Sequence, residues 1–395
     1  MPFTILQLLL VAGAAQGFLL AFLLVTRRVN PLASRLLGLL IFLISIQTLL
    51  VGFDNREFFL RFPHLSKISW LLPSLFGPLL FLFTRKITSE KPIWKRADCI
   101  HLVPFIVYFF YLLPYYAKSA AEKSAYLDNF EAALQDDFGF LNQLTNFLHL
   151  FYVTLSLFIV KKYQQGILNS FSDITQIRLR WLRQLLLFVL TVMLISVIIF
   201  YAKKWNIGWL TQLYRYHYLG VVALIYWIGY KALSQPRIFN QFELPVTHVP
   251  EPKKDVSISV VAEEEIPKNK YQKSTLTNDV ADTYLKQLAH LMENEKLYLR
   301  QELTIQDLAE RTGISRHQLS QLINERLEKN FYDFVNEYRV KEAQRMLVDP
   351  KYKHLTTLAI SGEAGFNSKA TFNAVFKKIT GQTPSEYIKS YKEVV

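Results

Sequence analysis

Seven apolar segments fill most of the first 233 residues of this chain. Hydrophobic residues make up 51% of the sequence and charged residues only 19%, an unusual balance for a soluble protein. Most of the segments approach the length of about 20 residues that a helix needs to cross the hydrocarbon core of a bilayer. We therefore predict seven membrane-spanning helices, at approximately Thr4–Thr26, Leu36–Phe53, Ile68–Thr84, Ile100–Ala117, Phe147–Val160, Leu185–Ala202 and Leu210–Tyr230.

Two of these spans need a further argument. The fifth is the shortest and is expected to extend back towards Leu141. The first is expected to remain a span rather than a cleaved signal peptide, because no positive charge precedes it whereas Arg27 and Arg28 follow it. The alternative to a membrane domain is a water-soluble, all-helical core. Aromatic residues near many span ends favour the membrane.

The charges in the loops predict the orientation. The loops after the first, third and fifth spans carry thirteen Lys and Arg residues, whereas those after the second, fourth and sixth carry seven. Loops rich in Lys and Arg remain in the cytoplasm. Seven spans then place the N-terminus outside and the C-terminus in the cytoplasm.

The net charge of +13 belongs to this membrane pattern. Residues 1–233 carry 22 basic and 10 acidic side chains, whereas residues 276–395 carry 17 and 16. The overall basicity is therefore not the footprint of a nucleic-acid partner.

Residues 234–275 are predicted to form a flexible linker. They contain five prolines and the acidic run Glu263–Glu265 among lysines, a composition that does not support a packed core. Helical spacing of apolar residues returns from Asn278 to Glu295. We thus expect three parts: a membrane domain at 1–233, the linker at 234–275 and a third domain at 276–395.

The sequence from Leu303 to Tyr387 contains the same unit twice. Each copy is a short helix, a tight glycine turn and a second helix that begins at a serine. Ser and Thr side chains accept hydrogen bonds from the free amides of a helix start, and glycine adopts the left-handed turn that other residues resist. The positions are held by Thr304, Gly313 and Ser315 in the first copy and by Gly365 and Ser368 in the second. These are two helix-turn-helix units.

A helix predicted at Phe331–Leu347 connects the two units. Its length of about 24 Å, at 1.5 Å per residue, can help to bridge the spacing of about 34 Å between successive major grooves on one face of B-DNA. One chain could therefore contact two successive grooves.

This arrangement resembles the DNA-binding domain of AraC-type transcription regulators. The segments that carry the resemblance are Phe334–Arg339 with Ala343 and Leu347, Ala364–Ser368 with Phe372, Phe376–Gly381, and Thr383–Tyr387. The resemblance covers roughly the last quarter to third of the chain. Together with the apolar spans it implies an all-α protein, with a seven-helix transmembrane domain followed by a tandem helix-turn-helix domain. The alternative for the last part is a plain bundle of two helical hairpins.

The resemblance also implies which side chains face DNA. In the first unit these are Arg316, His317, Ser320, Gln321 and Asn324, and in the second Lys369, Thr371, Asn373, Lys377 and Lys378. Many relatives carry arginine where Ala374 stands, so the second helix has little hydrogen-bonding reach. The first unit is therefore expected to carry most of the sequence specificity. Lys377 and Lys378 are expected to contact phosphates rather than bases.

Polar residues within the predicted spans are candidates for a ligand site. Arg215, His217 and His149 are the possible ligand-binding residues, because ionisable groups in a membrane often mark ligand pathways. His101, His149 and His217 could also hold a metal or haem. The alternatives are histidines that pack between helices and an arginine that snorkels to the headgroups. No enzyme, cofactor or metal motif is present in the sequence, and none of these functions is expected.

We interpret the chain as a transcription regulator in the bacterial inner membrane, with promoter DNA, the lipid bilayer and an unknown small-molecule signal as partners and a homodimer as a possibility. The alternative is a membrane transporter or enzyme whose C-terminal domain regulates it. A third hypothesis is proteolytic release of the DNA-binding domain.

The prolines of the linker exclude a rigid helix between membrane and DNA. Two ways of coupling remain. A ligand could change the association of membrane domains, which we favour, or release a DNA-binding domain that is docked on cytoplasmic loops through Glu263–Glu265.

Overall fold

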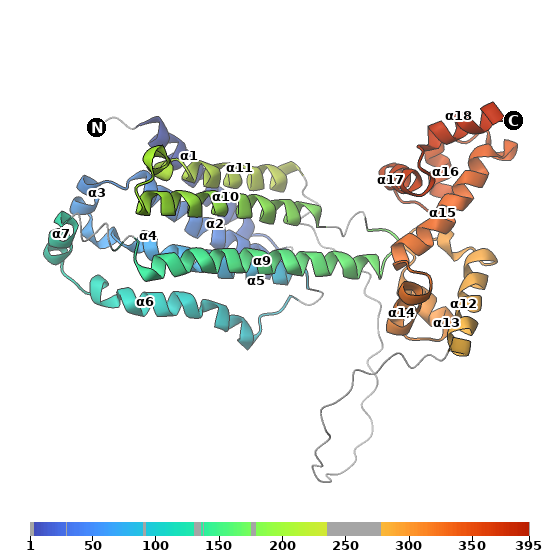
Figure 1. Ribbon diagram of the computed structural model, residues 1–395, viewed down its shortest axis with the longest axis horizontal. Helices are drawn as coiled ribbons and strands as arrows, with labels where there is room; N and C mark the ends of the chain where they lie inside the picture. The colour runs from blue at the N-terminus through green and yellow to red at the C-terminus, as the bar shows by residue number, and fades with distance from the viewer. Residues whose placement is uncertain are drawn as a thin grey trace, which may run out of the picture. The chain divides into compact units, whose positions relative to one another are not determined.

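The computed structural model describes residues 4–28, 30–89, 92–129, 136, 138–174, 179–234 and 278–394. The regular elements in these residues are helices, and one isolated β-bridge joins Phe171 to Thr304. The all-α prediction is therefore confirmed. The chain divides into two compact units (Figure 1). The first comprises Met1–Tyr163 and Leu179–Phe242, and the second comprises Gln164–Arg178 and Glu243–Val395.

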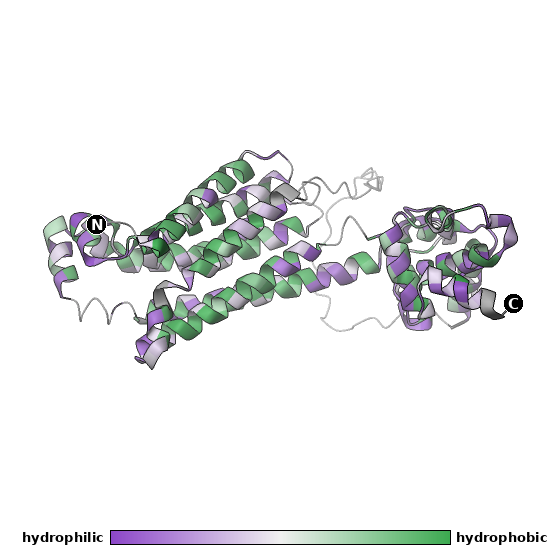
Figure 2. Cartoon of the chain, turned by 90° about the horizontal axis from the view of Figure 1, so that it is seen from above, coloured by the Kyte–Doolittle hydropathy of each residue, from purple (hydrophilic) through white to green (hydrophobic). Residues whose placement is uncertain are grey.

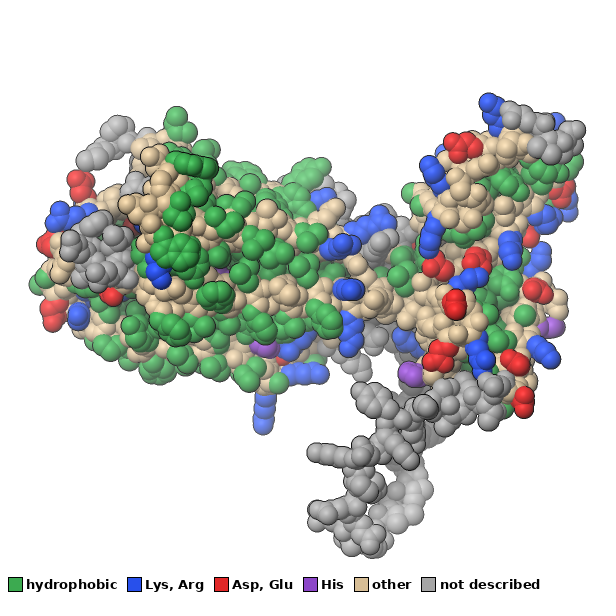
Figure 3. Space-filling view, viewed as in Figure 1, with side chains coloured by type: hydrophobic (Ala, Val, Ile, Leu, Met, Phe, Trp, Pro, Cys, Tyr) green, Lys and Arg blue, Asp and Glu red, His purple; other side chains and the backbone are tan. Residues whose placement is uncertain are grey.

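The first unit is a bundle of long apolar helices (Figure 2). Its core is formed mainly by leucine, isoleucine, valine and aromatic side chains from these helices. Many other large apolar side chains of the same helices are exposed, and apolar side chains are spread over much of the visible face of this unit in Figure 3. The main helices are α1 (Ile5–Val25), α2 (Pro31–Gly52), α5 (Phe76–Ile87), α6 (Val103–Tyr116), α9 (Phe140–Leu168), α10 (Arg180–Lys204) and α11 (Tyr218–Ser234).

Six helical stretches in the described residues are long and apolar enough to cross a membrane. They correspond to the first six predicted spans, and the seventh corresponds to a shorter apolar helix, Tyr218–Lys231. The fifth starts at Phe140, so the predicted extension towards Leu141 is confirmed. The six are Ile5–Val25, Pro31–Gly52, Pro63–Ile87, Arg96–Tyr116, Phe140–Leu168 and Arg180–Lys204.

Three of the predicted spans are not continuous α-helices. The third contains the 3-10 helix η2 (Leu72–Leu75) before α5, and the fourth begins with the 3-10 helix η3 (Arg96–Leu102). The predicted seventh span is split, because the 3-10 helix η4 (Gly208–Arg215) precedes α11. Arg215 therefore lies at the end of η4, before the start of α11. Polar residues interrupt the apolar run in η4, and the α-helix begins only at Tyr218.

The second unit contains two small cores that share one helix. Helix α15 (Phe331–Val348) contributes Phe331, Phe334 and Val335 to the first core, and Val340, Ala343 and Met346 to the second. The first core also includes side chains from α12 (Asn278–Glu293), η6 (Leu297–Leu299), α13 (Ile305–Thr312) and α14 (Arg316–Arg326). The second includes side chains from α16 (Thr357–Glu363), α17 (Lys369–Thr380) and α18 (Pro384–Val394). The predicted linking helix is thus confirmed as the common support of both helix-turn-helix units.

The predicted helix caps are present in this unit. The Thr304 hydroxyl accepts a hydrogen bond from the backbone N–H of Asp307, whose carboxylate accepts in return from the backbone N–H of Thr304. Ser315 and Ser368 cap α14 and α17 through the amides of Gln318 and Thr371. Each cap satisfies amides that would otherwise lack a partner at a helix start.

The two turn glycines differ in what they require. Gly313 has φ +73°, and a Cβ added there would meet open space, so only its backbone conformation favours glycine. Gly365 has φ +91°, and a Cβ there would lie 2.5 Å from the carbonyl oxygen of Tyr298 and 3.1 Å from Nε of Arg339. Gly365 therefore lets the second helix-turn-helix unit approach the backbone of η6, in the segment before the first unit.

This difference predicts the effect of adding a methyl group. Gly313→Ala should destabilise the second unit by roughly 1 kcal/mol through its left-handed backbone. Gly365→Ala should cost a further 1–3 kcal/mol, approximately, because backbone atoms must move apart. Hydrogen exchange of the amides of α13 to α17 in the full chain measures both effects. Gly362→Ala, which meets no atom within 4 Å, is the matched control. Equal protection in the Gly313 and Gly365 variants would contradict the argument.

Candidate nucleic-acid interface and ligand pocket

The first helix-turn-helix unit presents one polar face of α14. Leu319, Leu322 and Ile323 are buried in the core below it. On the opposite side Arg316, His317 and Asn324 are exposed, and Ser320 and Gln321 are partly exposed. All five predicted residues of this unit therefore lie on accessible positions of one helix.

Most hydrogen bonds of this face stay within the helix. Gln321 Nε2 donates to Glu325 Oε1 at 2.8 Å, and Asn324 Nδ2 donates to the carbonyl oxygen of Ser320 at 2.7 Å. Such exposed bonds contribute little to stability and can be exchanged for base edges. Arg316 differs, because its Nη2 donates to Oγ of Ser170 at 2.8 Å.

The second helix-turn-helix unit presents mainly positive charge. Lys369, Lys377 and Lys378 are exposed on α17, whereas Thr371 and Asn373 are partly buried. Thr371 Oγ1 accepts a hydrogen bond from Ser368 Oγ, and Lys378 Nζ lies 2.7 Å from Asp333 Oδ1. Ala374 is exposed between these residues. The face thus offers cations for phosphates and few groups for reading bases.

Arg339, in the middle of α15, joins the two cores. Its side chain is only 1% exposed, and its guanidinium nitrogens donate to the carbonyl oxygens of Tyr298, Arg300 and Ser172. Burial lowers the pKa of Arg339 to about 10, and nearby Asp173 opposes this decrease. The group therefore stays charged at neutral pH. Sequence reasoning treated this arginine only as part of a motif, because its partners are distant in the sequence.

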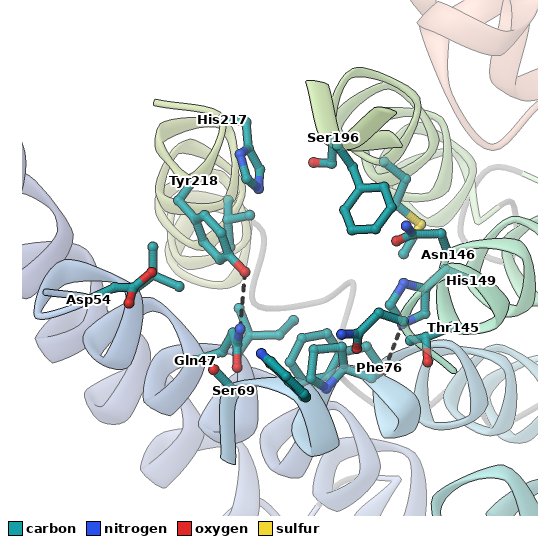
Figure 4. Close-up of a pocket in the computed structure, with 18 of the residues that line it drawn as sticks. Gln47, Asp54, Ser69, Phe76, Thr145, Asn146, His149, Ser196, His217 and Tyr218 are labelled. Carbon is teal, nitrogen blue, oxygen red and sulfur yellow. Dashed lines mark hydrogen bonds between the residues drawn. The ribbon is translucent and has the colours of Figure 1, made fainter. Parts of the chain in front are cut away.

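The helices of the first unit line a second candidate site, a partly open cavity of about 470 Å³ (Figure 4). His149 and His217 line this cavity, so the structure brings together two of the three predicted ligand residues. The side chain of the third, Arg215, lies outside the described residues. His149 stacks on Phe76 and bonds through Nε2 to the carbonyl oxygen of Pro73, so it is also a satisfied packing residue.

His101 does not line this cavity, and it bonds instead to the Tyr152 hydroxyl. Within the residues that the structure describes, no group of three or more His, Cys, Asp or Glu side chains is placed to hold a metal ion.

Two polar atoms of the cavity have no hydrogen-bond partner in the described part of the chain. Gln47 is 4% exposed, and its Nε2 donates to the Tyr218 hydroxyl at 3.1 Å while its Oε1 is unpaired (Figure 4). Asn146 Nδ2, across the cavity, is also buried and unpaired. An unsatisfied buried polar atom costs about 1–3 kcal/mol, and sites of this kind are often functional. The sequence offered no signal that distinguishes these amides from other polar residues in the spans.

Residues 308–390 match a family model described as a helix-turn-helix domain. A stretch of 92 residues is 34% identical to an uncharacterized HTH-type transcriptional regulator of Staphylococcus aureus strain COL. Regulators with the same description from strains MSSA476 and N315 share the same identity over the same length.

This match covers 23% of the chain but only 12% of the length of each relative. No solved structure matches the chain. The family match coincides with the two helix-turn-helix units and their shared helix α15. The C-terminal part of this chain is therefore a helix-turn-helix domain of the AraC type.

Proposed function

We propose that this protein is a membrane-embedded, sequence-specific transcription regulator, in which the first unit receives a signal and the second unit binds promoter DNA. The observation that carries this proposal is the presence, in one chain, of an AraC-type helix-turn-helix domain and six helical stretches of membrane-crossing length. DNA binding and a bilayer are thereby connected in a single molecule.

On DNA, α14 is the principal reading helix. The N-terminal residues of a recognition helix contact base edges in the major groove, and Arg316 and His317 are the first two residues of α14. Gln321 lies one turn further along, and a glutamine side chain can pair with adenine through two hydrogen bonds. Helix α17 lies at the neighbouring groove, where its lysines contact phosphates of the DNA backbone. The shared helix α15 keeps the two reading helices at a defined separation.

The exposed apolar side chains support the membrane location. Phe22, Phe110, Phe158 and Ile198 are each more than half exposed, on four different helices of the first unit. A surface of this extent is unfavourable in water and favourable against lipid. The loop charges orient the bundle with the second unit in the cytoplasm. The hydrogen bonds of Ser170 and Ser172 within the second unit support the same orientation, because the loop after the fifth span must then lie on the side of the C-terminal domain.

The cavity of the first unit is the site that we assign to the signal. Many of its polar residues come from the C-terminal part of α2, the first part of α9, the last part of α10 and the start of α11, which is the extracytoplasmic end in this orientation. The segments between α2 and α5 add further polar residues, among them Asp54, Arg56 and Lys67. The unpaired Oε1 of Gln47 requires a donor, and the unpaired Nδ2 of Asn146 requires an acceptor. A small molecule with both kinds of group and an apolar part that packs on Phe76 meets these requirements.

The same cavity could serve the alternative function of a transporter. Uptake of a solute by reconstituted protein that lacks residues 276–395 would favour that function. Genome-wide mapping of DNA occupied by the tagged protein, with and without residues 276–395, tests the proposal directly. We expect discrete sites for the full chain and none for the truncated chain.

The membrane topology is tested with reporters that function only in the cytoplasm. A fusion after Arg28, Lys91, Arg178 or Ser234 should be active, because each position follows an odd-numbered span. A fusion after Asp54, Lys123 or Lys204 should be inactive. Inactivity after Ser234 would remove the helix-turn-helix domain from the DNA and contradict the whole proposal.

Base reading is tested by substitutions in α14. Gln321→Ala and His317→Ala should each relax specificity at one position of the binding site, at a cost of roughly 1–3 kcal/mol. Lys377→Gln is the matched control, since the loss of a phosphate contact should weaken all sequences alike and lower the salt slope by about one unit. Lys377 is chosen because Lys378 already pairs with Asp333. Binding-site selection measures the change in specificity, and affinity titrations at several salt concentrations measure the salt slope. An unchanged selection profile in both α14 variants would refute the assignment.

The signal site is tested by Asn146→Leu, which removes the unpaired donor at similar volume. The variant should unfold at a higher temperature, because a buried polar group without a partner costs about 1–3 kcal/mol. It should also lose any change in DNA occupancy between growth conditions while keeping basal occupancy. Thr191→Val, on an exposed position of α10 that does not line the cavity, should change neither property. A normal response in Asn146→Leu would exclude the cavity as the signal site.

A further inference from the structure

A short segment of the loop between α9 and α10 belongs to the second unit. Ser170, Phe171 and Ser172, which we name the docking strand, pair with the start of α13 as an antiparallel bridge. The backbone N–H of Ser172 donates to the carbonyl oxygen of Leu303 at 3.2 Å, and the N–H of Ile305 donates to that of Ser170 at 3.0 Å. Ser172 is only 1% exposed, so the pairing is enclosed rather than superficial.

The polar interior of the second unit is completed by this strand. Arg339 Nη1 donates to the carbonyl oxygen of Ser172 at 3.2 Å, and Nη2 donates to its hydroxyl at 3.0 Å. Asn336, which is fully buried, also donates to the Ser172 carbonyl oxygen at 3.2 Å. Each of these donors also has a partner outside the strand, since Nη1 donates to Asn336 Oδ1, Nη2 to the carbonyl oxygen of Arg300, and Asn336 Nδ2 to that of Tyr332. Ser172 therefore binds to side chains that α15 presents, those of Asn336 and Arg339.

The strand also uses groups that a helix-turn-helix unit offers to DNA. The first helix of such a unit crosses the DNA backbone, and the second inserts its N-terminal residues into the groove. The backbone N–H of Ile305, the first residue of α13, donates to the carbonyl oxygen of Ser170. Arg316, the first residue of α14, donates through Nη2 to the Ser170 hydroxyl at 2.8 Å. Both are groups that phosphates or bases would otherwise contact.

We propose that the docking strand is an intrachain competitor of DNA for the first helix-turn-helix unit. Docked, it holds Arg316 and the start of α13, and operator affinity is low. Undocked, it frees both, while the chain connection keeps the domain close enough for rapid return. The strand follows α9 and precedes α10, and both helices line the cavity of the first unit. A change in these helices on ligand binding can thus be transmitted through the loop.

This inference uses DNA binding, which is part of the proposed function, as one readout. It differs from the coupling expected from the sequence. Docking through Glu263–Glu265 concerns residues outside the described part of the chain. The docking strand acts instead through backbone groups, two serine hydroxyls and a buried arginine.

A reversible disulfide tests the competition. Phe171 and Thr304 face each other as a pair without mutual backbone hydrogen bonds, the arrangement in which antiparallel side chains are closest. We would introduce Phe171→Cys and Thr304→Cys into a full chain with Cys99→Ser, in lipid nanodiscs. The probe is the DNA fragment that the wild-type chain occupies most strongly. Oxidation should lower the affinity for this fragment by about tenfold, equivalent to about 1.4 kcal/mol, and reduction should restore it.

The single variants Phe171→Cys and Thr304→Cys, oxidised and reduced, are the controls for the lost cap at Thr304. Excess DNA should slow disulfide formation in the double variant, because docking and DNA binding exclude each other.

A second experiment removes one hydrogen bond of the docking strand. Ser172→Pro lacks the N–H that donates to the carbonyl oxygen of Leu303, and it should raise DNA affinity severalfold. The control Gln165→Ala, at an exposed position near the end of α9, should leave DNA affinity unchanged.

Three results would overturn the inference. They are a disulfide that forms without lowering affinity, a disulfide that fails to form in the absence of DNA, and a rate of formation that DNA does not change. If the reduced chain binds no DNA, the proposed function fails, but the yield of disulfide still decides whether the strand docks.

Discussion

The second unit depends on the hydrogen bonds that the buried guanidinium group of Arg339 donates. A charged group at 1% exposure must be fully hydrogen-bonded, and here carbonyl oxygens supply the partners. Those of Tyr298 and Arg300 come from the segment before α13, and that of Ser172 comes from the docking strand. Gly365 lies against the same group, where a Cβ would be 3.1 Å from Nε. One side chain thus connects the first core, the second core and the docking strand, and removing it would leave several acceptors without a donor.

The same requirement, that buried polar groups find partners, operates differently in the first unit. Its core is apolar, and most serine and threonine hydroxyls bond to carbonyl oxygens one turn earlier in their own helices, as Ser45 and Thr84 do. Gln47 and Asn146 stand out because each has a buried polar atom that finds no partner among the residues the structure describes. We interpret these atoms as places kept for a ligand. Among the described residues, the buried side-chain polar atoms of the second unit are therefore paired, whereas Gln47 Oε1 and Asn146 Nδ2 of the first unit are not.

Features of the fold that depend on residues close together in the sequence were predictable, and those that depend on distant residues were not. The capping serines, the turn glycines and the apolar stripe of α15 act within a few residues, so their spacing predicted both helix-turn-helix units. The long apolar helices were predicted because length and hydropathy are local as well. The interruptions at η2 and η4 were missed, since polar residues and prolines within an apolar run do not show where the helix breaks. Likewise His149 and His217 could be selected as ionisable, but not assigned to a common cavity.

The sequence by itself determined the all-α architecture, the two helix-turn-helix units on a shared helix, and the polar face of α14. It did so because periodicity and capping chemistry are properties of short segments. Only the tertiary structure decided that Gln47 and Asn146 line one cavity and that Ser170 and Ser172 bond to Arg316 and Arg339. These residues are joined across long stretches of the chain, and a serine has no local pattern that indicates a distant partner. Contacts of this kind arise from packing, which fixes which backbone groups remain for a side chain to satisfy.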